Sequence, residues 1–189
     1  MNDAQRWQAL KRGDKSALEY IYKQHASDLL SYGYRFGKDE QVAEDCLQEL
    51  FVDLWNKREG LGDNDNIRKY LFVALRRRII RQIEQRRRRS ISEEPQEYHF
   101  SAELAVDELL AQAELNEEQL GRLKESLAKL SKRQREIIFL KYYSGLDYEA
   151  IGETMDLSYQ SARNLLSGAL RALRKSFVWM LFVLLNNFF

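Results

Sequence analysis

The sequence predicts an all-α protein with two small helical domains joined by an acidic linker. Only one proline and nine glycines occur in 189 residues, so few residues interrupt helices. Long segments repeat apolar residues at the helical period of about 3.6, and no alternating pattern is long enough for a strand. Apolar residues make up 44% and charged residues 31% of the chain, which is typical of a folded globular protein.

Charge and cysteine content restrict the function classes. The net charge is only +1, but residues 76–89 hold eight arginines and one acid, whereas 90–121 hold nine acids and no Lys or Arg. Such a change marks a boundary between units with different partners. The single cysteine excludes an intrachain disulfide framework, and the N-terminal residues lack the apolar core of a signal peptide. We therefore expect a cytoplasmic protein.

Helix start signals come early in the chain. Asp14 can accept hydrogen bonds at the start of a helix. One face of that helix is then apolar, aromatic or imidazole-bearing: Leu18, Ile21, Tyr22, His25 and Leu29. Asp39 is the predicted cap of the next helix, after Gly37 ends the preceding segment.

The segment Val42–Trp55 is the most informative helix. Its inner face is apolar at a four-residue step: Val42, Ala43, Cys46, Leu47, Leu50, Phe51, Leu54 and Trp55. The opposite face carries what we call the acidic stripe: Asp45, Gln48, Glu49 and Val52. An ordinary solvated face mixes Lys with Glu, whereas this stripe has the composition that a docking surface would show. The alternative is the solvated side of an amphipathic core helix.

A turn and a strongly basic helix follow. Glu59–Asp65 is rich in turn-forming residues, and Asn66 can start a helix. Its predicted inward residues are Ile67, Tyr70, Leu71, Ala74 and Leu75. Arginines further along can follow a phosphate backbone, and the candidates are Arg76, Arg77, Arg78 and Arg81. The alternative is a solvated basic helix end, and the nearby aromatics Tyr70, Phe72 and Trp55 are more typical of a core than of base stacking.

The second half begins after a proline-containing linker at 90–98. We divide the chain into a domain at 1–89, an acidic linker with some helix at 90–119, a domain at 120–176 and a hydrophobic tail at 177–189. Asn116–Gln119 and Ser131–Gln134 have the pattern of capping boxes. The first precedes Leu120, Leu123, Leu127 and Leu130; the second precedes Ile137, Ile138, Leu140 and Tyr143, and Gly145 ends that helix.

Residues 147–175 have the pattern of a helix-turn-helix. Asp147 caps a short first helix, and the small Ala150 permits a close helix crossing. A tight turn at Asp156-Leu157 leads to Ser158, the cap of the second helix. The second helix offers side chains for phosphates and base edges in the major groove: Ser158, Tyr159, Gln160, Ser161, Arg163, Asn164, and a basic flank of Arg171, Arg174 and Lys175. The alternative is a hairpin that only packs.

Catalytic and metal chemistry find no support in the sequence. His25, His99 and Cys46 lack the spacing of a four-ligand zinc site. No glycine-rich phosphate loop or nucleophile elbow is present. We therefore predict no enzyme activity, no metal and no cofactor. We interpret His25 as a core histidine and Cys46 as a small buried hydrophobe.

These segments together resemble the extracytoplasmic-function (ECF) group of bacterial RNA polymerase sigma factors, in the sigma-70 family. The resemblance runs from about Ala17 to Lys175. The first half is similar to region two in ALEYIYKQH, QVAEDCLQELFVDLW and IRKYLFVALRRR, and the second half to region four in LSKRQREIIFLKYYSGLDYEAIGETMDLSYQSARNLLSGALRALRK. It implies a region-two-like bundle and a region-four-like helix-turn-helix. The implied partners are core RNA polymerase and promoter DNA, with an anti-sigma factor as a further candidate.

The resemblance also implies roles for single residues. The stripe residues Asp45, Gln48 and Glu49 match positions that dock on the clamp helices of the polymerase. Residues 60–89 correspond to the part that reads and opens the minus-ten promoter element, and 158–170 to the recognition helix for the minus-thirty-five element. After YLFVAL the family often has an asparagine, then an aspartate and an arginine, whereas this chain has Arg77, Arg81 and Glu84. In the recognition helix, Ala162 replaces a common valine. We therefore expect core binding to follow the family more closely than promoter opening does.

The hydrophobic tail and the wider function classes leave alternatives. At 13 residues the tail is too short to span a bilayer, so we expect no stable membrane span. It is a buried last helix, a surface for an anti-sigma partner or an interfacial anchor, the last disfavoured because no Lys or Arg follows Lys175. A polymerase-independent helix-turn-helix regulator would leave the acidic stripe unused. An interaction protein held through its tail is the third class.

Overall fold

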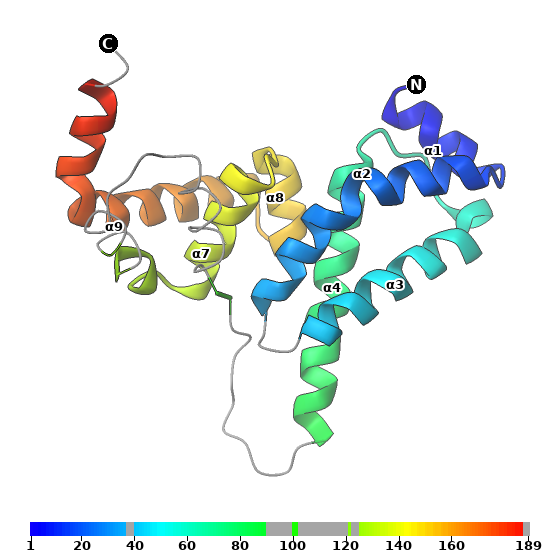
Figure 1. Ribbon diagram of the computed structural model, residues 1–189, viewed down its shortest axis with the longest axis horizontal. Coiled ribbons are helices and arrows are strands. Elements are labelled where there is room, and N and C mark those ends of the chain that lie inside the picture. The colour runs from blue at the N-terminus through cyan, green and yellow to red at the C-terminus, as the bar shows by residue number, and fades with distance from the viewer. Residues whose placement is uncertain (37–39, 90–99, 102–120, 122–124, 187–189) are drawn as a thin grey trace. The chain divides into compact units, whose positions relative to one another are not determined.

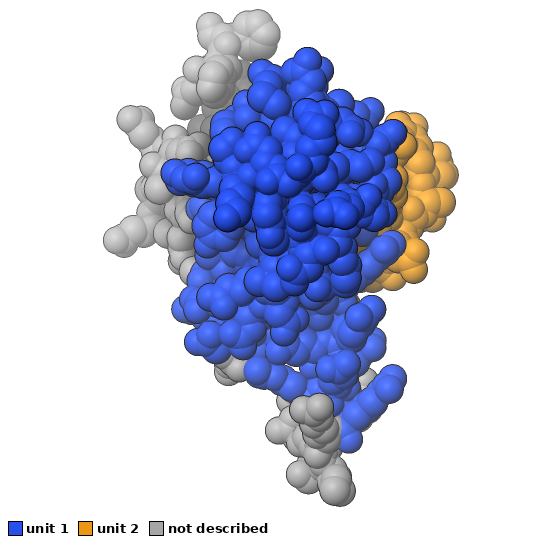
Figure 2. Space-filling model, turned by 90° about the vertical axis from the view of Figure 1, so that its right-hand side faces the viewer, with its two compact units in different colours: residues 1–99 blue, residues 100–189 orange. Residues whose placement is uncertain are grey.

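The computed structural model describes residues 1–36, 40–89, 100–101, 121 and 125–186, although nothing is described of the side chains of 87, 89 and 174–186. Two compact units are present, Met1–His99 and Phe100–Phe189 (Figures 1 and 2). The described residues form helices and no strands. The predicted all-helical class with two helical domains is therefore confirmed. The residue limits of the domains and the linker stay predictions.

Unit 1 is built around three long helices. Its described elements are α1 Asp3–Lys11, α2 Lys15–Gly33, η1 Tyr34–Phe36, α3 Glu40–Asn56, η2 Arg58–Gly60 and α4 Ile67–Arg89. Helices α2, α3 and α4 pack against one another, and α1 contacts α2, η2 and α4 (Figure 1). The largest fully buried apolar side chains are Trp7, Leu10, Ile21, Leu29, Tyr32, Ile67, Leu71, Phe72, Leu75 and Ile79. Burying such side chains is the main stabilising contribution to the unit.

The helix starts of unit 1 follow the predicted caps where they are described. The Asp14 carboxylate accepts a hydrogen bond from the Ser16 backbone N–H at 2.8 Å. The Asn66 side chain accepts one from the Lys69 N–H at 2.9 Å, so it caps α4. The predicted cap Asp39 lies outside the described residues, as does Gly37.

The predicted apolar and aromatic face of α2 extends to an exposed edge. Tyr22, one of the residues of that face, is 45% exposed. Its ring lies at the edge of the interface, edge-on to Phe51 with centroids 5.0 Å apart. Nearer its end, α2 approaches α3 closely because Gly33 has no side chain: a Cβ there would lie 2.8 Å from the Ala43 Cβ.

Unit 2 contains a helical hairpin on a supporting helix. Its described elements are α7 Lys132–Ile138, the π-helical turn η3 Phe139–Tyr143, α8 Tyr148–Met155 and α9 Tyr159–Asn186. The capping box at the start of α7 is confirmed: the Ser131 hydroxyl accepts from the Gln134 N–H at 3.3 Å, and the Gln134 amide oxygen accepts from the Ser131 N–H at 2.9 Å. The predicted box at 116–119 lies outside the described residues.

Two features of unit 2 were not predicted. The helix after Ser131 widens into a π-turn before Gly145, whose φ of +64° favours glycine. Phe100, placed in the predicted linker, is fully buried in this unit. Its ring lies edge-on to Phe139 with centroids 6.0 Å apart, and Phe139 stacks on Tyr143 at 4.6 Å. Phe100 therefore ties the linker to unit 2.

The last helix continues into the apolar tail. Helix α9 extends to Asn186, further than the predicted domain end at 176. Within the described residues, no helix combines the length and the apolar character that a membrane crossing needs.

Candidate functional site

The acidic stripe lies on the outer side of α3. The opposite side of the helix is packed, since Ala43, Cys46, Leu47, Leu50, Phe51 and Leu54 are buried. Gln48 and Glu49 are exposed, Asp45 is half-buried, and Val52 is 57% exposed. Asp45 accepts a hydrogen bond from the Gln41 amide at 2.9 Å. The structure therefore brings the four predicted stripe residues together on one open helix face.

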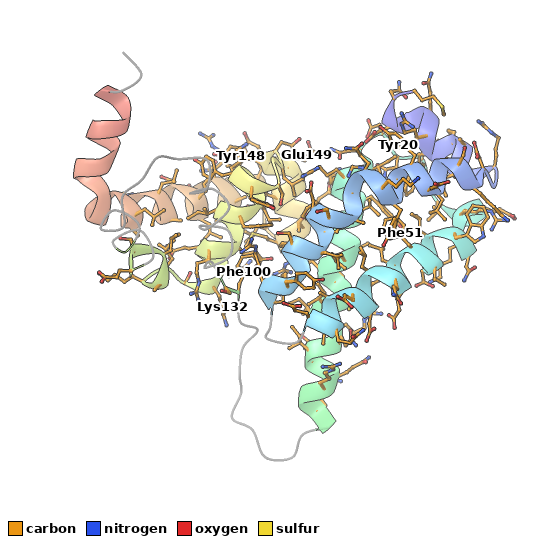
Figure 3. The ribbon with its side chains drawn as sticks, viewed as in Figure 1. Tyr20, Phe51, Phe100, Lys132, Tyr148 and Glu149 are labelled. Carbon is orange, nitrogen blue, oxygen red and sulfur yellow. The ribbon has the colours of Figure 1, made fainter. Side chains whose placement is uncertain are left out.

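An apolar hollow adjoins this stripe. It has a volume of about 420 Å³ and is lined by Lys15, Leu18, Glu19, Tyr22, Phe51 and Trp55. Trp55 follows Val52 by three residues, so the two side chains are neighbours on the helix surface. Phe51 lies between α2 and α3 (Figure 3). The stripe thus continues into a surface that can receive an apolar side chain.

Arg78 connects the stripe with α4. Its guanidinium pairs with the Asp53 carboxylate, and its Nη1 lies 3.6 Å from the Glu49 carboxylate. Hydrogen bonds from Arg78 and Lys57 hold the pKa of Asp53 below its usual value. Because Arg78 is engaged between two helices, we leave it out of the proposed DNA-contacting set.

The other predicted arginines of α4 differ in exposure. Arg77 and Arg81 are exposed, whereas Arg76 is half-buried. Arg86 and Arg88 are also exposed near the end of the helix. The end of α4 therefore offers a basic surface suited to phosphates. Phe72 is fully buried and Tyr70 packs edge-on against Trp7, so these aromatics belong to the core, as expected.

The helix-turn-helix of unit 2 is formed by α8 and α9. Asp147 caps α8 by accepting from the Ala150 N–H at 2.7 Å. The turn contains Asp156, whose φ of 55° is left-handed. Gly152 was not predicted to take part in this turn, but a Cβ at this position would lie 2.8 Å from the Leu157 carbonyl oxygen. An isolated glycine inside the short first helix, four residues before Asp156, is the signal that could have revealed this close approach.

The outward face of α9 carries the predicted DNA-contacting residues. Ser158 caps the helix by accepting from the Ser161 N–H at 3.1 Å. The inner face is packed by Ala162, Leu166 and Ala169. The outer face exposes Tyr159, Gln160, Ser161, Arg163, Asn164 and Arg171. The side chain of Lys175 lies outside the described residues.

Local contacts orient this outer face. The Gln160 amide donates to the Asn164 amide oxygen at 3.0 Å. The Tyr159 ring lies edge-on to Tyr148, with centroids 5.8 Å apart, and the Arg163 guanidinium carbon is 5.9 Å from the Tyr159 centroid. Tyr148 comes from the start of α8 (Figure 3). Helix α8 therefore helps to hold the first turn of α9.

Cys46 and His25 lie away from these faces, and burial shifts the pKa of each. Burial raises the pKa of the Cys46 thiol to about 11, with the Glu49 charge adding to the effect, and the thiol lies 2.8 Å from the Gln82 side-chain oxygen. Burial, followed by the Arg68 charge, lowers the pKa of the half-buried His25. Among the described residues, no cluster of His, Cys, Asp and Glu could hold a metal ion.

Comparisons with known proteins match both units. The family model "Sigma-70 region 2" matches residues 21–89, and "Sigma-70, region 4" matches residues 120–173. The ECF RNA polymerase sigma factor SigL of Mycobacterium tuberculosis is 28% identical over 164 residues, covering 85% of this chain and 89% of the relative. The RNA polymerase sigma factor YlaC of Bacillus subtilis is 25% identical, covering 86% and 92%.

Solved structures share the fold. The sigma factor RpoE of Bartonella quintana, crystallised with the anti-sigma factor NepR, superposes with a TM-score of 0.57 at 21% identity, covering 88% of this chain and 97% of that one. CnrH, in complex with the cytosolic domain of CnrY, superposes with a TM-score of 0.61 at 19% identity, covering 92% and 95%. The likeness covers both helical units.

Proposed function

This chain is a sigma factor of the sigma-70 family, in its ECF group, and we propose that its two units direct core RNA polymerase to promoters through separate surfaces. Unit 1 docks on the polymerase and contacts the minus-ten element. Unit 2 contacts the minus-thirty-five element. The observation that carries the proposal is that one chain presents an open acidic stripe on α3 and an exposed helix-turn-helix face on α9.

The stripe supports polymerase docking by its composition and exposure. Gln48, Glu49 and Val52 are exposed on a helix whose other face is buried, and an apolar hollow lies beside them. A partner helix with basic residues and one apolar anchor complements such a surface. We place the polymerase contact here, because the negative charge also makes the stripe unsuited to DNA.

The DNA contacts are proposed on two helices. On α9, Arg163 can pair with a guanine edge, and Gln160 or Asn164 with an adenine edge. On the minus-ten side, residues 60–89 provide a turn, the exposed Arg77 and Arg81, and the basic end of α4. Lys175 stays a proposed phosphate contact. These roles are binding roles, and no catalytic step is assigned to this chain.

A polymerase-independent helix-turn-helix regulator is not favoured. It would account for α8 and α9, but it assigns no role to unit 1, whose residues 21–89 match sigma-70 region 2. The anti-sigma factor NepR bound to RpoE supports an anti-sigma partner for this chain as well. We place the protein in the cytoplasm, where polymerase and promoter DNA are found.

A double substitution tests the polymerase contact. Asp45→Ala with Gln48→Ala should weaken binding to core polymerase roughly tenfold, equivalent to about 1.4 kcal/mol, with helix content unchanged by circular dichroism. The matched control is Gln24→Ala with Ser27→Ala, two exposed residues of α2, which should leave core affinity unchanged. If the stripe variant binds core polymerase as tightly as the wild type does, the acidic stripe is not part of the polymerase interface.

A further inference from the structure

Helix α1 lies outside the part of the chain that matches sigma-70 region 2, which begins at residue 21. It nevertheless contacts η2 and α4, the two elements that flank the turn between α3 and α4. We call residues 60–66 the α3–α4 loop. Helix α1 therefore holds a loop within residues 60–89, whose contact with the minus-ten element is the proposed function on which the following inference rests.

The main contact is made by Trp7. Its indole N–H donates a hydrogen bond to the Gly62 carbonyl at 2.8 Å. The side chain is only 1% exposed, and its ring lies edge-on to Tyr70 of α4 with centroids 4.8 Å apart. A buried tryptophan has few ways to move, so the carbonyl that it binds is held in one place.

A second contact fixes the end of the loop. The Asp3 carboxylate accepts a hydrogen bond from the Ile67 N–H at 3.0 Å, and that N–H belongs to the first turn of α4, where intrahelical partners are missing. Asn64 accepts from the Asn66 N–H at 3.0 Å, and Asn66 accepts from the Lys69 N–H. Side chains of the protein therefore cap the start of α4, which begins at Ile67, three residues after Asn64.

Two half-buried side chains of α1 add a third contact. The Gln8 amide and the Lys11 ammonium both donate to the Asp63 carboxylate, at 2.8 and 2.9 Å. The hydrogen bond from Lys11, followed by that from Gln8, lowers the pKa of Asp63. Because Asp63 is 85% exposed, this pair contributes little to stability. Its value lies in orienting the carboxylate.

The other side of the loop is open. Gly60, Gly62, Asp63 and Asp65 are exposed, and a Cβ at either glycine would meet no atom within 4 Å. The loop carries Asp63 and Asp65 and no basic residue, so it suits hydrogen-bonding base edges better than phosphates. A loop fixed from one side and accessible from the other is preorganised for binding, which lowers the entropy lost when a ligand binds.

We propose that α1 positions the α3–α4 loop to read an unpaired base of the minus-ten element, with Trp7 and Asp3 as the positioning residues. Neither residue needs to touch DNA in this role. Trp7 acts through the Gly62 carbonyl, and Asp3 acts through the first turn of α4. The N-terminal helix is thus a specificity-supporting part of unit 1.

The test compares three variants in holoenzyme with core polymerase. Trp7→Phe keeps an aromatic ring and removes the N–H donor, and Asp3→Ala removes the α4 contact. The control is Arg6→Ala on the same helix, whose guanidinium lies 3.4 Å from the Tyr20 ring on α2 rather than near the loop. Opening of a promoter is followed with a fluorescent base analogue in the minus-ten element, together with core affinity and hydrogen exchange of residues 60–66 in the free protein.

Both positioning variants should speed exchange of the loop amides and reduce open-complex formation roughly fivefold, the factor expected for one lost hydrogen bond. Core affinity and binding to a minus-thirty-five duplex should stay unchanged, and Arg6→Ala should change none of these. Faster exchange with normal opening, or no change in either, overturns the inference. A wild-type protein that binds core polymerase but opens no promoter instead overturns the proposed minus-ten function, and the inference fails with it.

Discussion

In unit 2 the proposed binding residues are distinct from the packed residues, whereas in unit 1 the proposed binding surface shares an ion pair with the helix packing. On α9, the outer residues Gln160 and Arg163 contact their near neighbours Asn164 and Tyr159, while Ala162 and Leu166 on the inner face carry the packing. In unit 1, Arg78 of α4 pairs with Glu49 of the acidic stripe and with Asp53. Substitutions on the outer face of α9 should therefore change DNA binding alone, whereas changes around Arg78 should alter packing and docking together.

We expect the greatest change from a substitution that lowers the stability of unit 2 and leaves the stability of unit 1 unchanged. Phe100→Ala removes a fully buried ring from the cluster with Phe139 and Tyr143, and such truncations cost about 3–5 kcal/mol. Denaturant unfolding followed by circular dichroism should show an earlier transition for unit 2 and an unchanged one for unit 1. Phe100→Leu, which keeps more volume, should have a smaller effect. A curve identical to the wild type would show that Phe100 does not hold the linker to this unit.

A second substitution tests whether the outer face of α9 contributes to DNA binding but not to stability. Arg163→Ala should weaken binding to a promoter duplex by about 1–3 kcal/mol, the discrimination given by one bidentate base contact, with core affinity and stability unchanged. Holoenzyme binding is measured on the target and on a scrambled duplex. Ser167→Ala, an exposed residue one turn further along α9, serves as the control. Equal affinity for both duplexes, before and after the change, would refute a reading role for Arg163.

A smaller effect tests the coupling in unit 1. Arg78→Gln leaves Asp53 and Glu49 without this cation, so we expect a small loss of stability, at the level of a partly exposed ion pair. Core polymerase binding should change roughly threefold, because the charge and position of Glu49 in the stripe are altered. Arg77→Gln, an exposed neighbour on the same helix, should leave core binding unchanged. If the two variants behave alike in core binding, unit 1 is no more coupled than unit 2.

The smallest effect is a pH dependence of the same contact. Since hydrogen bonds from Arg78 and Lys57 lower the pKa of Asp53, the stabilisation is present above the unfolded-state pKa of about 3.9. It is lost as the pH falls through the lower folded-state pKa. The difference in melting temperature between wild type and Arg78→Gln should therefore be present near neutral pH and shrink in acid. A difference that is independent of pH would assign the effect to lost packing.

Helical periodicity and capping chemistry carried much of the fold prediction. The caps at Asp14, Asn66, Ser131, Asp147 and Ser158 depend on residues close in sequence, so they could be read from the chain. The faces of α3 and α9 were predictable for the same reason. The exposure of Tyr22 could not be predicted, because an aromatic residue at helical spacing can lie either in a core or at the edge of an interface.

Contacts between distant residues explain what the sequence did not reveal. The pairing of Arg78 with Asp53 could not be predicted, because a run of arginines carries no sign of which one has a carboxylate partner 25 residues away. The Trp7–Gly62 hydrogen bond joins residues 55 positions apart in the sequence, and the ring contact between Phe100 and Phe139 joins residues 39 positions apart. In α1, the Asn2–Gln5 capping box is a local signal that could have revealed the helix itself, but not its hold on the loop.

The central claim is that this chain gives core polymerase a promoter specificity that neither has alone. Run-off transcription from genomic fragments, with core polymerase in the presence and absence of the protein, tests it most directly. We expect discrete new transcripts only when both are present, and fewer of them with the Asp45→Ala, Gln48→Ala variant and with Arg163→Ala. Transcripts that do not depend on the protein, or a tight footprint of the protein on DNA without polymerase and no new transcript, would contradict it.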